Sequence, residues 1–381
     1  MTACSNPRAR VLILLAGSLL VGGCNRLQGS GDIRVQGPGV APQLGFACCD
    51  QGVEAAQNLF AQPGVLEQLK ALHATVEIPT TDFSPQRAAL VQQLSQQGIP
   101  VVAGIVLSAA QGYYLNADNV PQAAARIAAF EQWSRTYELR WAAVGLDIEP
   151  NFGQLAQLRR QRWRLLATLA RRSVAFGHMA RARRSYAQLV DQIRAWGDPV
   201  QIYQMPYVPA EHAVHTTLAD RLLTTPEVRG DQDYVMLYTS FARPGGAGVI
   251  WSLGRLSWGI AIGSTSGPGT PGTGFAPLDW TEFSRDLIVA SHFTPHVGVY
   301  NLEGCVRQGF LPRLLTMDWS QTVVLPAASV QRGERHIWLF RSVLWVASNL
   351  IYLAAGALFL IWLSWRRARS RPKPLRTTGN A

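Results

Sequence analysis

The chain has 381 residues, of which 48% are hydrophobic and 15% charged, so it can bury a core and is not a disordered chain. Its formal net charge is +11. Six of the positive charges follow residue 365 and two precede residue 24, which leaves +3 for the rest of the chain. This balance argues against a basic domain of the kind that binds nucleic acid, and we expect no nucleic-acid partner.

Residues 1–24 have the form of a secretion signal, because two arginines precede an apolar run at 11–21. The letters VGGC that follow resemble the lipobox of bacterial lipoproteins, which would make Cys24 the lipidated first residue of the mature chain. Plain cleavage and an uncleaved anchor are the alternatives. Residues 25–40 are polar and glycine-rich, so we expect them to form a flexible linker.

Beyond the linker, short apolar or alternating runs recur, and segments with helical spacing lie between them. We predict strands at 44–49, 74–79, 100–107, 141–150, 200–207, 234–240, 258–264 and 297–302. Eight strands with helices between them are typical of an α/β fold of the (β/α)8 type, the TIM barrel. We therefore predict one such domain over residues 41–330.

A long helical segment at 155–196 carries ten arginines. Its length predicts a helix or a helical pair in the outer layer of the barrel. A solvated outer face is our interpretation of the arginines, and contact with an anionic polymer or lipid headgroups is the alternative.

Residues 343–365 contain 23 residues without a charge, about the length that crosses a hydrocarbon layer of about 30 Å. We predict a single C-terminal transmembrane helix here, with a buried core helix as the alternative. Residues 366–381 are basic and contain no acid, and cationic flanks resist translocation. We therefore expect a single-pass protein of the cell membrane with a cytoplasmic tail and a periplasmic main domain.

The fourth predicted strand ends in two acids, Asp147 and Glu149. Residues two apart on a strand point to the same face, roughly 6–7 Å apart along the strand. In a barrel of this type, chemistry occurs at the C-terminal ends of the strands. Two neighbouring inward carboxylates raise the proton affinity of one of them, as a general acid requires, and such a pair is typical of glycoside hydrolysis. Solvated loop acids or a salt-bridge site are the alternative.

This pattern resembles the family 18 glycoside hydrolases, the chitinase-like enzymes, whose fourth strand ends D-x-x-D-x-D-x-E and whose sixth carries M-x-Y-D. Asp147, Glu149 and the Met-x-Tyr that ends at Tyr238 match these motifs. The resemblance implies that Glu149 is the acid, that Asp147 orients the N-acetyl group of the substrate and that Tyr238 contacts it. Three motif aspartates are replaced, by Ala142, Gly145 and Thr239.

The family 25 lysozyme-like hydrolases are a competing match, because their barrels also carry D-x-E. Both resemblances imply attack on an amino-sugar polymer such as peptidoglycan or an exopolysaccharide. We predict a membrane-anchored glycoside hydrolase outside the cytoplasm. The alternative is a non-catalytic carbohydrate-binding or envelope-assembly protein, and the missing motif aspartates favour it.

Other polar and aromatic residues near the predicted strand ends are candidates for substrate binding, with plain packing as the alternative. They are Asp50, Glu77, Tyr203, Gln204, Tyr207, Trp258 and Glu303. His212 and His215 lack a third ligand nearby, so we predict no metal site, and we expect no cofactor.

Three cysteines lie in the predicted domain, Cys48, Cys49 and Cys305. The first and eighth strands of a closed barrel are neighbours, so we predict a disulfide between Cys305 and one of the other two. Buried thiols are the alternative.

Overall fold

The computed structural model describes residues 31–49, 51–266 and 276–369. The predicted signal segment with Cys24, the candidate Asp50 and residues 370–381 of the basic tail lie outside the described residues.

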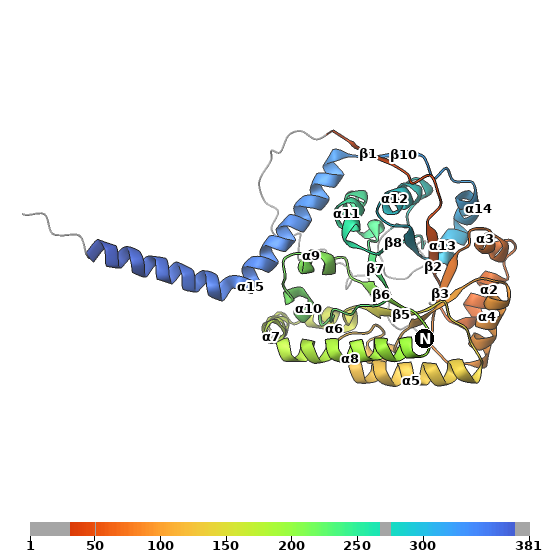
Figure 1. Cartoon of the computed structure of the whole chain (residues 1–381), viewed down its shortest axis with the longest axis horizontal. Helices are drawn as coiled ribbons and strands as arrows, with labels where there is room; N and C mark the ends of the chain where they lie inside the picture. Colours follow the sequence, from red (N-terminus) through yellow and green to blue (C-terminus); the bar gives the residue numbers. More distant parts are fainter. Residues whose placement is uncertain (1–30, 50, 267–275, 370–381) are drawn as a thin grey trace, which may run out of the picture.

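Eight parallel strands close into a barrel in the order in which they occur along the chain, with helices around them (Figure 1). The predicted TIM barrel is therefore confirmed, and each predicted strand overlaps an observed one. The strands are β2 (Gln43–Ala47), β3 (Thr75–Pro79), β4 (Val101–Ile105), β5 (Ala143–Ile148), β6 (Val200–Gln204), β7 (Gln232–Met236), β8 (Gly259–Gly263) and β9 (His296–Tyr300).

The helices follow the strands and form the outer layer. They are α2 (Val53–Phe60), α3 (Val65–Ala71), α4 (Pro85–Gln96), η1 (Ala109–Gln111), α5 (Val120–Thr136), α6 (Phe152–Arg159), α7 (Arg162–Ser173), α8 (Phe176–Ala195), α9 (Val208–His212), α10 (Leu218–Leu223), η2 (Thr239–Phe241), α11 (Gly246–Leu253), η3 (Gly254–Leu256), α12 (Trp280–Phe293), α13 (Leu302–Arg307), α14 (Phe310–Leu315) and α15 (Ala327–Arg369). The segment 155–196 thus forms parts of three helices, where we expected one or two.

The alternation of residues along each strand separates the core from the barrel interior. On β5, Val144, Leu146 and Ile148 face the helical layer, where they pack in a buried apolar cluster. Residues 143, 145, 147 and 149 consequently face the interior. The same alternation on the other strands places small residues such as Gly45, Gly104 and Gly298 inside the barrel, and these leave space at its centre.

A two-stranded sheet outside the barrel joins the two ends of the domain. Strand β1 (Ile33–Gln36) pairs antiparallel with β10 (Thr322–Leu325). Residues 33–36 fall in the segment for which we expected a flexible linker, and that expectation is wrong here. Val35 is buried in the apolar core, and its burial stabilises this short strand. The strand was not predicted because glycines flank it in the sequence.

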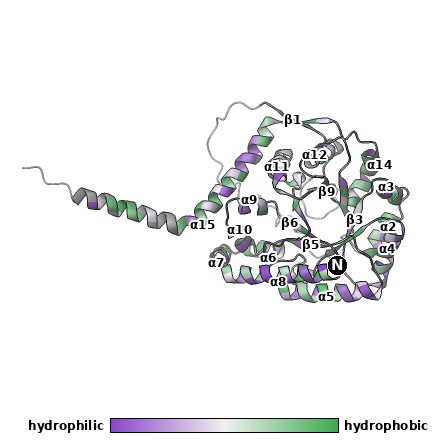
Figure 2. Cartoon of the chain, viewed as in Figure 1, coloured by the Kyte–Doolittle hydropathy of each residue, from purple (hydrophilic) through white to green (hydrophobic). Residues whose placement is uncertain are grey.

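The last helix, α15, begins against the barrel and then projects away from it (Figure 1). It includes the apolar segment 343–365, and its projecting half carries hydrophobic residues (Figure 2). Within the described residues, however, no helix satisfies the combined requirements of length and apolar character for crossing a membrane. The structure therefore does not support the predicted transmembrane helix.

Candidate active site

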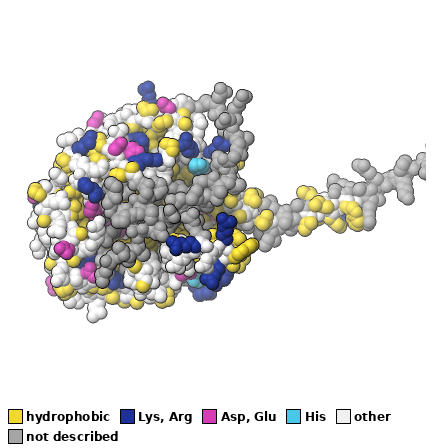
Figure 3. Space-filling model, turned by 180° about the vertical axis from the view of Figure 1, so that it is seen from behind, with side chains coloured by type: hydrophobic (Ala, Val, Ile, Leu, Met, Phe, Trp, Pro, Cys, Tyr) yellow, Lys and Arg dark blue, Asp and Glu magenta, His cyan; other side chains and the backbone are white. Residues whose placement is uncertain are grey.

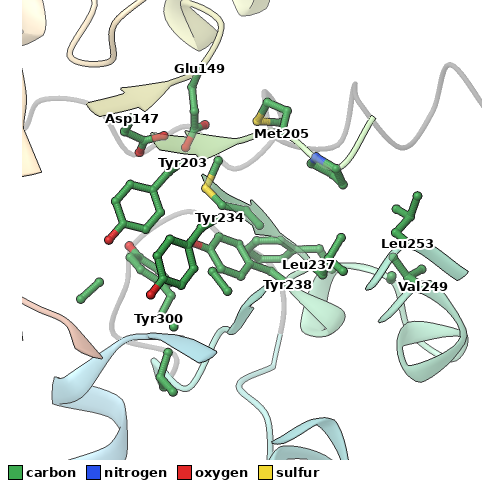
Figure 4. A pocket seen from close by; sticks show the side chains of 18 of the residues that line it. Asp147, Glu149, Tyr203, Met205, Tyr234, Leu237, Tyr238, Val249, Leu253 and Tyr300 are labelled. Atoms are coloured by element: carbon green, nitrogen blue, oxygen red, sulfur yellow. The ribbon is translucent and has the colours of Figure 1, made fainter. Parts of the chain in front are cut away.

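Asp147 and Glu149 project from the C-terminal end of β5 into one cavity, and Figure 4 shows their carboxylates side by side at its edge. The cavity has a volume of about 520 Å³ and extends down into the barrel interior. Both acids reach it because they share a strand face with Gly145, as the sequence predicted.

The backbone that carries the two acids is fixed by the loop after β4. The N–H of Leu115 donates to the carbonyl of Asp147, and the N–H of Glu149 donates to the carbonyl of Leu115, both at 3.1 Å. The loop itself is held from outside, because the hydroxyl of Tyr186 donates to the carbonyl of Asn116 at 3.0 Å. The two carboxylates therefore start from a backbone with little freedom, which favours a defined geometry.

Four tyrosines form the wall opposite and below the acids. The rings of Tyr203 and Tyr234 stack with their centroids 5.4 Å apart, and those of Tyr238 and Tyr300 stack at the same distance. Figure 4 shows the rings facing into the space beneath Asp147 and Glu149. Flat aromatic faces of this kind suit the C–H faces of a sugar.

The hydroxyl of Tyr238 stays neutral over the physiological pH range. Burial raises its pKa well above the ordinary value, and the negative charges of Asp147 and Glu149 raise it further. The pKa of Tyr203 is raised in the same way, by burial first and then by the charge of Glu77. The hydroxyl of Tyr203 already donates to Gln201 Oε1 at 2.8 Å. The phenol of Tyr238 can donate a hydrogen bond to a bound ligand.

Glu77, from β3, places a third carboxylate inside the barrel, next to Tyr203. A Cβ atom added to Gly104 would lie 3.0 Å from its Oε1, and one added to Gly145 would lie 3.1 Å from the same atom. The two glycines thus make room for this carboxylate. Gly145 stands where the family 18 motif has an aspartate, and Glu77 occupies the space beside it.

The start of α15 forms part of the cavity wall through residues such as Arg332, His336 and Phe340. The ring of Phe340 packs near that of Tyr207, with centroids 6.4 Å apart. Close glycine contacts hold the helix there, because a Cβ added to Gly333 would lie only 2.6 Å from the carbonyl oxygen of Gly248 on α11. The first turns of α15 are therefore a fixed wall of the cavity.

Of the predicted site residues, Asp147, Glu149, Tyr238, Glu77, Tyr203 and Tyr207 line the cavity. Gln204 does not, because it follows the inward-facing Tyr203 on the strand and must face outward. There its side-chain amide donates to the carbonyl of Val228 at 3.1 Å.

Two further candidates also lie elsewhere. Trp258 precedes β8, so it lies at the opposite end of the barrel, where it stacks on His296 with ring centroids 3.8 Å apart. Glu303 lies on α13, because the chain has already turned into a helix at Asn301, and it accepts a hydrogen bond from the N–H of Cys49 at 2.5 Å.

The cysteine prediction is wrong in its pairing. Cys48 and Cys49 form a disulfide with each other, and Cys305 is a buried thiol. The first and last barrel strands are neighbours as expected, but the Cys305 thiol is directed toward the β8 side, where it donates to Thr265 Oγ1 at 3.6 Å. Burial raises the pKa of Cys305 to about 12.

Several cavity residues were not predicted. Tyr234 and Tyr300 share strand faces with Met236 and Gly298, so strict alternation along the predicted strands would have placed them inside. The sequence contains no pattern that predicts the contribution of α15 to the cavity wall, because nothing in it connects Arg332 or Phe340 with strands far away along the chain.

Comparison with known proteins gives the fold alone. Neither a protein-family model nor a curated protein matches the chain. Solved structures of similar fold include a GH18 chitinase from Pseudoalteromonas aurantia, at 8% identity and a TM-score of 0.44 over 72% of this chain and 99% of that chain. The PgaB (BpsB) glycoside hydrolase domain from Bordetella bronchiseptica has 9% identity and a TM-score of 0.43 over 72% of this chain and 98% of that chain.

A xylanase and alpha-amylase inhibitor protein from Scadoxus multiflorus is similar at 9% identity and a TM-score of 0.41, over 73% of this chain and 99% of that chain. These three proteins include both enzymes and an inhibitor. At such identities and TM-scores the similarity indicates nothing about the activity of this chain.

Proposed function

We propose that this protein is a glycoside hydrolase that acts on an amino-sugar glycan, with Glu149 as the general acid. The observation that carries the proposal is that Asp147 and Glu149 line one cavity together with seven tyrosines, four of which form the two stacked pairs. Cleavage of a glycosidic bond needs a proton for the leaving oxygen while positive charge develops on the sugar. A carboxylic acid beside a carboxylate can meet both needs, and the aromatic wall can hold the sugar ring.

The resemblance to family 18 suggests the remaining roles. Asp147 would orient the N-acetyl group, whose own oxygen would attack the anomeric carbon while Glu149 protonates the leaving oxygen. Tyr238 is a neutral phenol that could donate to the same N-acetyl group. Glu77 lies beside Gly145, so it could supply the negative charge that this position of the motif lacks.

The test is a screen of the full chain for cleavage of peptidoglycan fragments and chitin-type oligosaccharides, with products detected by mass spectrometry. Glu149→Gln keeps the shape of the side chain but cannot deliver a proton. Glu67→Gln, an exposed residue of α3, is the matched control for the loss of one carboxylate. Turnover by the parent and by Glu67→Gln, without turnover by Glu149→Gln, is the expected result.

The outcome that contradicts the proposal is saccharide binding without turnover by any of the three proteins. In that case the protein is a carbohydrate-binding module on a hydrolase-like barrel. Ala142 and Gly145, which stand where the family 18 motif has aspartates, would then mark the loss of activity.

We propose further that this activity is exercised outside the cytoplasm, at a membrane. The support is in the sequence alone: the signal-like segment 1–24, the uncharged segment 343–365 and the basic residues after it. Alkaline extraction of the membrane fraction tests the attachment, with a chain that ends at residue 342 as the control. Release of both proteins by alkali would contradict it.

A further inference from the structure

Helix α7 presents an unusual outer surface. Only Arg172 of this helix is buried, and the large apolar residues Trp163 and Leu166 are 83% and 56% exposed. Val174, the C-cap residue of α7, and Phe176, the first residue of α8, are also exposed. Single exposed apolar residues are common on proteins, but a group of this size on neighbouring turns indicates an interaction site.

The helical period arranges these residues in a band. At about 100° per residue, Trp163, Leu166, Ala167 and Ala170 fall on one outward arc. Arg162 lies on one side of this arc, and Arg164 and Arg171 lie on the other. All of these side chains are exposed. We call this surface the α7 band.

The charge around the α7 band has one sign. Residues 151–190 contain nine arginines and no aspartate or glutamate. Arg172 and Arg183 have acidic partners within the protein, Asp118 at 2.9 Å and Asp220 at 2.8 Å. Within the described part of the chain, no salt bridge involves the exposed arginines at 160, 162, 164, 171, 181 and 184.

The α7 band is held firmly and lies near α15. The guanidinium of Arg172 also donates to Gln154 Oε1 at 2.7 Å and to the carbonyl of Leu222 on α10 at 3.2 Å. Helix α10 contacts both α7 and α15. Figure 3 shows basic and hydrophobic side chains gathered below the point where α15 leaves the barrel, in the region that α7 occupies in Figure 1.

We infer that the α7 band binds the surface of a membrane that contains anionic lipid. An apolar stripe with a tryptophan, bordered by arginines, is the pattern of a helix that lies in the headgroup region, with its apolar side chains inserted and its cations at the phosphates. An anionic polysaccharide would satisfy the arginines but would leave Trp163 and Leu166 in water. A second copy of the chain would bring like charges together. A lipid surface can bind both the apolar residues and the arginines of the α7 band. This inference does not rest on the proposed hydrolase activity.

The experiment measures the reactivity of individual arginines in the full chain. The protein is mixed with vesicles of phosphatidylcholine, or of phosphatidylcholine and phosphatidylglycerol in equal amounts, and exposed arginines are modified with phenylglyoxal and mapped by mass spectrometry. Each arginine near an anionic surface contributes about fivefold to binding. We expect modification of Arg162, Arg164 and Arg171 to slow by about tenfold or more on the mixed vesicles only.

Arg34, Arg140 and Arg307 are exposed on other parts of the molecule and serve as internal controls that should react equally in all samples. The double variant Trp163→Ser, Leu166→Ser should lose most of the protection. Its matched control, Val40→Ser with Leu315→Ser, changes two exposed apolar residues elsewhere and should keep it.

Equal reactivity on the two kinds of vesicle would overturn the inference, because proximity to any bilayer would then explain the result. Protection by soluble dextran sulfate but not by mixed vesicles would also overturn it, in favour of a polyanionic polymer as the partner.

Discussion

Two pairs of neighbouring carboxylates in the described part of the chain lie in different surroundings. Asp147 and Glu149 lie two residues apart at the end of β5 and border the cavity. Glu211 of α9 and Asp220 of α10 lie in the layer outside the barrel, and both are fully buried. Burial of two acids therefore does not by itself mark an active site in this molecule.

The surroundings of the second pair explain the difference. The carboxylate of Glu211 accepts hydrogen bonds from the N–H groups of Ala219 at 2.7 Å and Asp220 at 2.9 Å, and from the hydroxyl of Thr216 at 3.0 Å. Asp220 forms an ion pair with Arg183. These are protein groups that stabilise α10, whereas the first pair borders space large enough for a ligand. The comparison predicts that changes to the first pair affect turnover and changes to the second affect stability.

The largest expected effect is on turnover. Replacing Glu149 by Gln should lower kcat/KM by about a thousandfold, because a general acid contributes about 10²–10⁴ to the rate. The free energy of unfolding, measured in urea, should change by less than about 1 kcal/mol, since the side chain borders the cavity and keeps its size. A large loss of stability would show that Glu149 is a structural residue like Glu211.

The matching change in the second pair should have the opposite profile. In Glu211→Gln, the side-chain NH2 group replaces one of the two oxygens that accept hydrogen bonds from the N–H groups of Ala219 and Asp220. One buried N–H group then loses its acceptor, so we expect a loss of about 2–4 kcal/mol in the free energy of unfolding. Turnover per folded molecule should stay near that of the parent. If turnover falls instead while stability is kept, the second pair takes part in the chemistry.

Tyr238→Phe tests the wall of the cavity. It removes one neutral hydrogen-bond donor, which is worth about 1–1.5 kcal/mol, so kcat/KM should fall about tenfold. Because the pKa of Tyr238 is raised, the loss should be the same at every pH at which turnover is measured. Tyr137→Phe, outside the cavity, is the control. A loss that grows with pH in the neutral range would mean that the phenol ionises.

The smallest expected effect is a pH slope in stability. Burial and the nearby charge of Glu211 raise the pKa of Asp220 well above its ordinary value, although Arg183 opposes the shift. The folded state therefore binds this proton more tightly than the unfolded state, and stability is lost as pH rises from about 4 toward the folded pKa.

Asp220→Asn removes this titration. Relative to the parent, the variant should gain free energy of unfolding as pH rises, by at most about 1.4 kcal/mol for each pH unit. Urea unfolding of both proteins at about pH 5 and about pH 7 measures the difference. An unchanged difference between the two proteins over this interval would contradict the prediction, because the folded protein would then hold no proton on Asp220 above about pH 5.

The barrel and the position of the first pair could be predicted from local sequence. Runs such as 141–150 combine an apolar face with acids two residues apart, and the period of a strand alone places Asp147 and Glu149 on one face. The prediction that both Tyr203 and Gln204 bind substrate was wrong for Gln204, because adjacent residues of a strand point to opposite faces and only Tyr203 faces the cavity. Tyr234 and Tyr300 could have been found by applying the period of the strand.

The sequence by itself determined the eight strands, their inward residues and the acids at the end of β5, because the alternation of side chains depends only on the backbone of each strand. The tertiary structure decided the disulfide of Cys48 with Cys49, the pairing of β1 with β10, the place of Glu77 between Gly104 and Gly145, and the wall that α15 adds to the cavity. Each of these depends on which distant segments come into contact, and that is set by packing of the whole domain. The same holds for the α7 band, whose apolar residues are exposed because no other element of the described structure covers them.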